Sequence, residues 1–258
     1  MKICSYILLF LLITDCSEKR LPKEKFSQTS FGLDHHFEHD TAYFTIQNTL
    51  YTPVRISISS RAKAHQDLVK KFDILIVDAR TDTIVKISAP GKDTVQLKFH
   101  SAFGDPRKEV NPSPIAYPFP KNKRYKVIQG YNGSFSHKSD YSRYAIDFNM
   151  KVGDTVCSAD DGYVVGVIKD YKERGNTPAW RDYANFITLF HPESGLYIQY
   201  VHLMHNGSFV QVGDRVEKGQ PIGLSGMTGY TSGPHLHFNV LKPANKGVIS
   251  TPVEFEKR

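Results

Sequence analysis

Short stretches in which apolar and polar residues alternate run through most of this 258-residue chain. Residues 54–58 (VRISI) and 196–203 (LYIQYVHL) are examples. Such alternation places every second side chain on the same face of a β-strand. Turn signals such as residues 52–53 (TP) and 90–91 (PG) separate the stretches, and no amphipathic pattern is long enough for a four-turn helix. The sequence therefore predicts a mainly β protein.

Composition divides the chain into segments. Residues 40–101 consist of short alternating runs, which predict a β-sandwich-like module. Residues 17–39 are polar, and the proline-rich residues 102–120 predict a linker. Residues 121–258 again contain short strands and glycine turns, which predict a second β domain.

The N-terminus predicts export. Lys2 precedes a mostly apolar run through Ile13, which is far shorter than the roughly 20 residues that span a bilayer. Residues 1–16 therefore read as a signal peptide. Residues 13–16 (ITDC) resemble a bacterial lipobox, so we expect lipidation and membrane attachment at Cys16, with an ordinary cleaved signal as the alternative. The expected location is the bacterial cell envelope, or outside the cell.

Charge and cysteines narrow the class of partner. The net charge of +7 favours association with anionic polymers of the envelope or with nucleic acid. No Lys/Arg run carries interleaved aromatic residues, so we expect no nucleic-acid partner.

With Cys4 removed in the signal and Cys16 lipidated, Cys157 has no cysteine to pair with, and we expect it to be a small buried hydrophobe. We expect a monomer.

The most informative motif is residues 233–238 (GPHLHF). On a strand, His235 and His237 point to one face, while Leu236 and Phe238 point to the other, toward a core. Imidazole is a common zinc ligand and the usual proton-transfer group near neutral pH. A chance pair on a half-exposed strand is the alternative.

Other donors surround this motif in the sequence. Asp147 lies in the apolar run 144–148 (YAIDF), where a carboxylate is costly to bury unless a metal or a cation such as Arg143 compensates it. His137 lies in a polar segment and could equally be a solvated loop residue. Alternation places His202 on the face of Ile198 and Tyr200. Together these histidines and Asp147 form the kind of N and O donor set that zinc prefers.

Ordered blocks between residues 116 and 243 resemble the lysostaphin-type (LytM-type) zinc metallopeptidases, which cut peptide bonds in bacterial peptidoglycan. The blocks that carry the resemblance are residues 136–137 (SH), 144–147 (YAID), 156–164 (VCSADDGYV), 200–203 (YVHL), 212–223 (VGDRVEKGQPIG) and 229–238 (GYTSGPHLHF). The resemblance implies an antiparallel β-sheet metallopeptidase domain with a groove-shaped active site.

The resemblance also implies residue roles. His137, Asp147 and His237 would bind one zinc ion per chain, and His202 and His235 would be catalytic residues beside it. The commonest family spacing, H-x-x-x-D, would put Arg143 at the first ligand position, and a guanidinium has no lone pair to donate. The chain resembles a subgroup with a longer insertion, so we place that ligand at His137. Asn239 also departs from the glutamate that relatives often carry there.

Two other classes of function compete with a peptidoglycan endopeptidase. One is a non-catalytic regulator that activates another cell-wall hydrolase, and the other is a module in which zinc is purely structural. No H-E-x-x-H, G-x-S-x-G or Walker A motif offers a different chemistry. The cluster of His35, His36, Glu38 and His39 is expected to be a solvated stretch, and the insertion at 170–180 is either a substrate wall or a passive hairpin tip.

Overall fold

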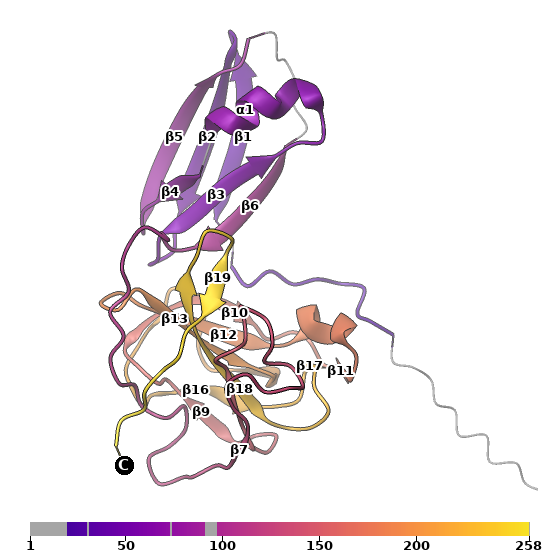
Figure 1. Ribbon diagram of the computed structural model, residues 1–258, viewed down its shortest axis with the longest axis vertical. Coiled ribbons are helices and arrows are strands. Elements are labelled where there is room, and N and C mark those ends of the chain that lie inside the picture. Colours follow the sequence, from indigo (N-terminus) through magenta and orange to yellow (C-terminus); the bar gives the residue numbers. More distant parts are fainter. Residues whose placement is uncertain (1–19, 30, 73, 91–96, 258) are drawn as a thin grey trace, which may run out of the picture.

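A computed structural model describes residues 20–29, 31–72, 74–90 and 97–257, which form two β-rich parts, one above the other in Figure 1. The predicted mainly β fold is confirmed. The expected signal peptide and the lipidation site at Cys16 lie outside these residues. Within the described ranges, no helix combines the length and the apolar character needed to cross a membrane.

The N-terminal part is a sandwich of two antiparallel three-stranded sheets, as its alternating pattern predicts. One sheet has the order β1-β2-β5 and the other β4-β3-β6. Phe44, Ile46 and Ile56 are fully buried between them, and a short helix, α1, adds Leu68 and Phe72 to the same core. The bounds are β1 Gly32–Glu38, β2 Thr41–Asn48, β3 Val54–Ser59, α1 Gln66–Phe72, β4 Leu75–Val77, β5 Thr81–Ser88 and β6 Lys98–Phe103, with a 3-10 turn, η1, at Lys63–His65.

Strand β1 lies in the segment that was expected to be polar and solvated. Leu33, His35 and Phe37 alternate with exposed residues and face the sandwich core, where the ring of His35 stacks on Phe44. The prediction for His35 was wrong because an imidazole can occupy an apolar strand face among aromatic rings. His36 remains exposed on the opposite face, against Tyr43.

The C-terminal part is built on an eight-stranded sheet of order β15-β10-β12-β13-β18-β8-β7, in which β19 pairs with β18. A three-stranded sheet, β14-β16-β9, and a parallel pair, β11 and β17, complete it. The strands of the large sheet are β7 Val127–Gln129, β8 Ile146–Phe148, β10 Gly162–Ile168, β12 Phe186–His191, β13 Leu196–Val201, β15 Arg215–Val216, β18 Leu236–Pro243 and β19 Val248–Ser250. The remaining elements are β9 Thr155–Cys157, β11 Arg174–Gly175, β14 Leu203–Ser208, β16 Pro221–Ser225, β17 Gly229–Tyr230 and the 3-10 helix η2 Pro178–Tyr183.

Alternation divides the large sheet into a core face and an open face. Ile198, Tyr200, Leu236 and Phe238 are buried in the main core. The residues between them on β13 and β18 point to the other face, which carries the candidate site. A single set of strands therefore supplies both the core and the floor of the site.

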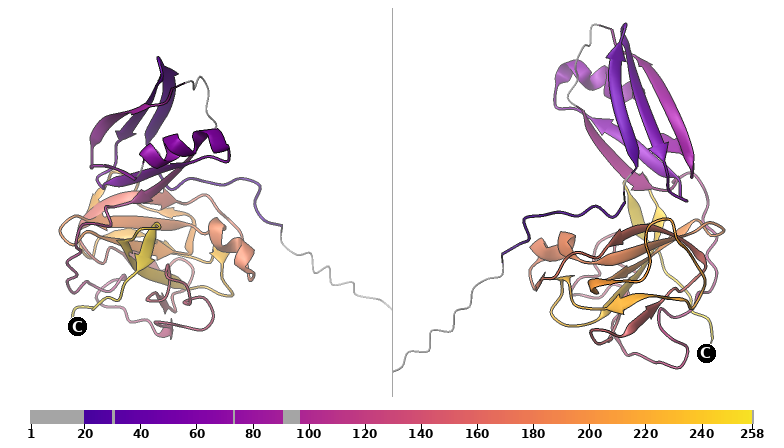
Figure 2. Two further views of the ribbon diagram at one scale, coloured as in Figure 1. Left: turned by 45° about the horizontal axis from the view of Figure 1, so that its top comes forward. Right: turned by 180° about the vertical axis from the view of Figure 1, so that it is seen from behind.

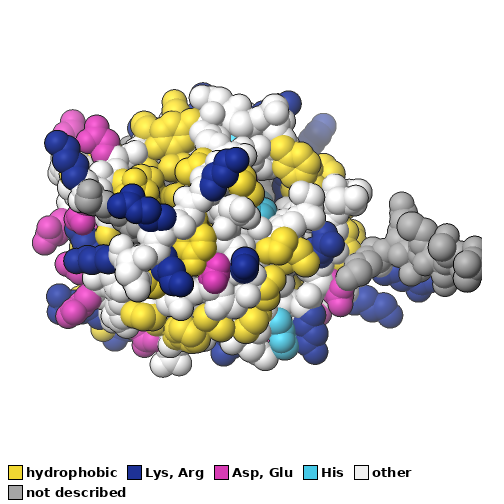
Figure 3. Space-filling model, turned by 90° about the horizontal axis from the view of Figure 1, so that it is seen from below, with side chains coloured by type: hydrophobic (Ala, Val, Ile, Leu, Met, Phe, Trp, Pro, Cys, Tyr) yellow, Lys and Arg dark blue, Asp and Glu magenta, His cyan; other side chains and the backbone are white. Residues whose placement is uncertain are grey.

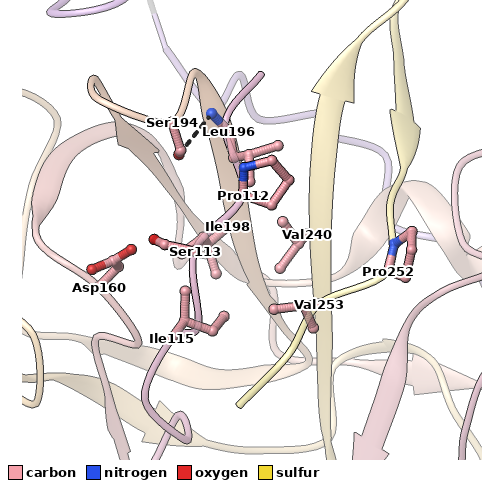
Figure 4. A pocket seen from close by; sticks show the side chains of 10 residues that line it. All are labelled: Pro112, Ser113, Ile115, Asp160, Ser194, Leu196, Ile198, Val240, Pro252 and Val253. Atoms are coloured by element: carbon pink, nitrogen blue, oxygen red, sulfur yellow. Dashed lines mark hydrogen bonds between the residues drawn. The ribbon is translucent and has the colours of Figure 1, made fainter. Parts of the chain in front are cut away.

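The proline-rich segment 102–120 is packed against the C-terminal part rather than free. Ile115 and Phe119 belong to its main core, and Ile115 forms an isolated parallel bridge with Phe255. Figure 4 shows Pro112 and Ile115 beside strand β13, around a cavity of only about 10 Å³. The prolines therefore shape a strap that is fixed to the domain.

The two parts meet through specific side chains. The ring of Phe103 stacks on Tyr197, and the Tyr197 hydroxyl makes a short hydrogen bond with the hydroxyl of Thr52. The buried Arg55 donates through Nη2 to the carbonyl of Gly247 at 2.8 Å. Figure 2 shows this junction, beside the β19 hairpin, from two further directions. These contacts bring strand β6 to the open face of the large sheet.

Candidate active site

Asp147 lies at the centre of a row of side chains that crosses three strands. It is paired with His237 on β18 and with Gln129 on β7. His237 Nδ1 lies 2.9 Å from Asp147 Oδ1, and Gln129 Nε2 donates to Asp147 Oδ2 at 2.9 Å. The flanking residues Ile146 and Phe148 are buried in the core. The apolar run around Asp147 therefore anchors the strand while the carboxylate faces the open side.

His137 reaches the same point from a turn-rich loop. Its side chain is fully buried, and its Nδ1 donates to the carbonyl of Gly130 at 2.9 Å. That hydrogen bond leaves Nε2 with a lone pair, 3.2 Å from His237 Nδ1 and 3.2 Å from Asp147 Oδ1. The loop between His137 and Asp147 carries Arg143 away from the site, where it pairs with Asp140. The alternative in which Arg143 neutralises Asp147 was wrong.

The three residues have the spacing of a zinc site. One ligand atom each from His137, Asp147 and His237 lies within 4.8 Å of the other two. Their separations of 3.2, 2.9 and 3.2 Å are close to the edge of a tetrahedron with arms of about 2.0–2.1 Å, which is about 3.3 Å. Two imidazoles and a carboxylate are also a donor set of catalytic zinc. The residues present therefore fit a zinc ion.

His235 and His202 stand beside this group. His235 Nε2 lies 3.8 Å from Asp147 Oδ1, and the rings of His235 and His202 are 4.6 Å apart between centroids. The expected shared face of His202 with Ile198 and Tyr200 was wrong. Those two residues are in the core, whereas His202 follows the end of β13 with a left-handed φ of 64° and lines the cleft. Non-glycine residues seldom adopt this backbone region, and such strain often marks functional sites.

Hydrogen bonds fix the same tautomer in both of these histidines. His202 Nδ1 donates to the carbonyl of Thr228 at 2.7 Å, and His235 Nδ1 donates to the carbonyl of Gly233 at 2.9 Å. Each ring therefore keeps a lone pair on Nε2. Burial, reinforced by the neighbouring His235, lowers the pKa of His202 to about 3, and burial also lowers the pKa of His235. Both imidazoles are neutral at pH 7, with Nε2 unprotonated.

Burial and pairing oppose each other at Asp147 and His137, two of the three candidate ligands. Burial disfavours the charge on Asp147, but the adjacent imidazoles of His137 and His237 lower its pKa below the ordinary value. Burial likewise works against a charged His137, and the adjacent Asp147 carboxylate raises its pKa nonetheless. The carboxylate is therefore ionised at neutral pH, as metal binding requires.

Asp147, His202, His235 and His237 line a cleft of about 690 Å³. Phe135, from the loop before His137, stacks on the ring of Tyr230. The guanidinium of Arg181, on η2, also lies over that ring, 5.6 Å from its centroid. Trp180, in the insertion at 170–180, is buried in a small aromatic cluster. Arg181, which follows the insertion directly, lines the cleft.

Gln129 is a site residue that the sequence did not single out. It donates to both Asp147 and Ser136, and it accepts from the backbone N–H of Phe135 at 3.2 Å. The only sequence signal is a polar residue that ends the short apolar run 127–129, and such residues are common. Register with Asp147, which no sequence pattern reveals, gives it this position.

Three histidines outside the site have other partners. His65 and His100 hydrogen-bond to serines of the sandwich, and His191 hydrogen-bonds to Ser194 in the β12–β13 turn, near Asp160. Cys157 is buried, which raises the pKa of its thiol and fits the expected role as a small hydrophobe.

Figure 3 shows one end of the molecule, where Lys and Arg side chains are interspersed with acidic and hydrophobic ones.

Comparison with known proteins finds several that are similar to this chain. An uncharacterized metalloprotease of Buchnera aphidicola is 28% identical over 227 residues, covering 81% of this chain and 56% of that protein. The glycyl-glycine endopeptidase ALE-1 of Staphylococcus capitis is 42% identical over 117 residues, covering 44% of this chain and 28% of that protein. The peptidoglycan DD-endopeptidase ShyA of Vibrio cholerae is 27% identical over 141 residues, covering 52% and 30%.

The catalytic domain of lysostaphin from Staphylococcus simulans is a solved structure with 29% identity, and the match covers 49% of this chain and 88% of that chain with a TM-score of 0.36. The chain spans little more than half the length of the first of the curated relatives, and about a third or less of the other two. Residues 141–250 match the family model described as peptidase family M23, a range that contains Asp147, His202, His235 and His237. The chain therefore carries a domain of peptidase family M23.

Proposed function

We propose that this chain is a zinc-dependent endopeptidase that hydrolyses peptide cross-links or stem peptides of bacterial peptidoglycan. The observation that carries the proposal is the convergence of His137 Nε2, Asp147 Oδ1 and His237 Nδ1 at the spacing of a tetrahedral zinc site. Family membership and the peptidoglycan endopeptidases among its relatives support the substrate class.

The side chains of the site would have two roles: some bind the metal, and others transfer a proton. When bound, zinc would supply a Lewis acid that polarises the scissile carbonyl and lowers the pKa of water. Gln129 holds the far oxygen of Asp147, which keeps the carboxylate oriented. His202 and His235 each present an unprotonated Nε2, so either can accept a proton from the attacking water and return it to the leaving amine.

The geometry favours an enzyme over a module with structural zinc. A structural zinc site is usually closed by four protein ligands. His235 Nε2, the nearest extra nitrogen, lies 3.8 Å from Asp147 Oδ1, which is longer than the 2.9–3.2 Å separations within the group of three. A fourth position would thus stay open for water on the cleft side. The intact donor set likewise argues against a regulator that has lost its ligands.

Hydrolysis of purified peptidoglycan tests the proposal. The zinc-loaded protein should release new amino termini, and a chelator should abolish this release until zinc is restored. Stoichiometric zinc without hydrolysis would favour the regulator. Loss of folding on chelation, with no hydrolysis before it, would favour structural zinc.

We also propose where the protein is located and how its chain is divided into domains. We infer an extracellular or cell-envelope protein, because its relatives act on peptidoglycan. A signal peptide at residues 1–16 with lipid on Cys16 would place it at a membrane surface of that envelope. The sandwich would be an accessory module and the segment from residue 121 onward the peptidase domain. Radiolabelled fatty acid incorporation, lost in Cys16→Ser, tests the lipid anchor.

A further inference from the structure

A second cavity, of about 720 Å³, lies between the sandwich and the peptidase domain. Strand β6 contributes Ser101 and Phe103 to one wall, and the β18–β19 turn contributes Lys246 to another. Gln28 closes a third side, where its backbone carbonyl accepts a hydrogen bond from the N–H of Val167 at 2.8 Å. Nothing in the proposed chemistry uses this space.

The second cavity continues the active-site cleft. Ser139, Tyr141 and Gln199 line both. The floor is one uninterrupted sheet face, because β13 and β18 pair in unbroken register from Val201 and His237 to Tyr197 and Leu241. The candidate metal ligand His237 lies in the first cavity and Leu241 in the second. The two cavities are therefore two ends of a single groove that runs along the strands.

The groove has the length of a short extended peptide. His237 and Leu241 are four residues apart on β18, and a strand rises about 3.4 Å per residue, so the floor extends roughly 14 Å from the metal group. A substrate peptide in the same extended conformation would place about four residues along it on one side of the cleaved bond.

Tyr141 fixes the width of the groove where the two cavities join. Its hydroxyl donates to Gln199 Oε1 at 2.7 Å, and its backbone carbonyl accepts from Asn239 Nδ2 at 2.7 Å. Tyr141 is 44% exposed, so a peptide can pass along it. Asn239, where relatives often carry a glutamate, thereby holds this loop in place.

We propose that the second cavity is a distal substrate subsite, which holds the peptide of peptidoglycan beyond the cleaved bond against strand β6 of the sandwich. The apolar Phe103 and Leu241 and the hydroxyl of Ser101 suit an extended peptide, and the cationic Lys246 suits the free carboxylates that stem peptides carry. Asp140 also lines the cavity, but its carboxylate is paired with Arg143. This inference rests on the proposed endopeptidase function. It assigns the sandwich a direct part in substrate selection.

A ladder of peptides that lengthens one residue at a time from the cleaved bond tests the subsite. For the wild type, kcat/KM should rise with each residue to about four and then level off. The total gain should be on the order of tenfold or more, because burial of a single methylene already provides about that factor. Ser101→Trp, which fills the cavity, should remove the gain for the longest peptides and leave the shortest peptide unaffected.

Lys98→Trp is the matched control, because Lys98 is exposed on the same strand but does not line the cavity. Lys246→Glu should raise KM for peptides that end in a carboxylate and not for the corresponding amides. Rates independent of length, or equal losses for short and long peptides in Ser101→Trp, would overturn the subsite while leaving the endopeptidase intact.

If the wild type cleaves no peptide at all, the endopeptidase proposal fails, and calorimetry with the longest peptide decides the subsite separately. Binding that Ser101→Trp weakens and Lys98→Trp preserves would support the subsite. Equal binding by all three proteins would overturn it.

Discussion

His237 on β18 and Asp147 on β8 are directly opposed across the sheet, and their ligand atoms lie 2.9 Å apart. On both strands the neighbouring residues are buried in the core, Leu236 and Phe238 on one and Ile146 and Phe148 on the other. A slip of one residue would turn both polar side chains into that core. The hydrophobic pattern that stabilises the fold thus also fixes the geometry of the candidate metal site.

Asp147→Ala should remove most zinc binding, because two imidazoles alone hold zinc weakly against buffer. Metal analysis after dialysis measures the loss. Asp140→Ala, which removes an exposed carboxylate from the loop between His137 and Asp147, serves as the control and should retain one zinc per chain. Full zinc content in Asp147→Ala would show that this aspartate is structural.

His137→Ala should likewise lose zinc, whereas Arg143→Ala should keep it. The His137 Nε2 lone pair faces the other two ligand atoms, and Arg143 is paired with Asp140 outside the site. Zinc content of the two purified variants separates the long-insertion assignment from the shorter family spacing. A zinc-free Arg143→Ala protein with a normal melting temperature would contradict the assignment.

His202→Ala and His235→Ala should keep zinc and fold normally, yet lose hydrolysis by a factor on the order of 10²–10⁴. Both rings are held through Nδ1 by backbone carbonyls and are free at Nε2 for proton transfer. Zinc content and turnover must be measured on the same preparations. Variants that lose zinc would make these histidines ligands of a closed site.

Gln129→Ala should weaken zinc affinity by about 10–100-fold, the usual effect of removing a partner that orients a metal ligand. Gln129 acts through Asp147 Oδ2 and through the loop that carries His137. Competition with a chromogenic chelator measures the affinity without reference to activity. Gln211→Ala, an exposed glutamine elsewhere in the domain, should leave it unchanged, and an equal affinity in both variants would remove Gln129 from the site.

Acid should destabilise the fold by removing the Asp105–Arg107 pair at the start of the proline-rich strap. Hydrogen bonds from Arg107 lower the pKa of the buried Asp105 to about 2, below its ordinary 3.8. The unfolded chain therefore binds the proton first, so this pair contributes its full stability above pH 3.8 and loses it as the pH falls to about 2. Arg107→Ala should reduce the free energy of unfolding at pH 7 and have little effect near pH 2. An equal reduction at both would contradict the linkage.

Local alternation predicted much of the fold and part of the site. It correctly placed His235 and His237 on one face with Leu236 and Phe238 on the other, because a regular strand leaves no choice. It failed for His202, because a left-handed residue at the strand end reverses the direction of the side chain.

Sequence patterns could not predict the contacts between distant segments of the chain. Gln129 meets Asp147 only through strand register, and the second cavity exists only because the sandwich packs beside β13. His35 was misassigned because its polar neighbours concealed a strand whose inner face is lined by aromatic rings.

Cleavage of peptidoglycan peptides at the group of His137, Asp147 and His237 can be measured by mass spectrometry of purified peptidoglycan after incubation with the zinc-loaded protein. We expect new pairs of amino and carboxyl termini within the peptides, absent with chelator and with Asp147→Ala. Intact peptides across several cross-link chemistries, with one zinc bound per chain, would rule out the proposed endopeptidase.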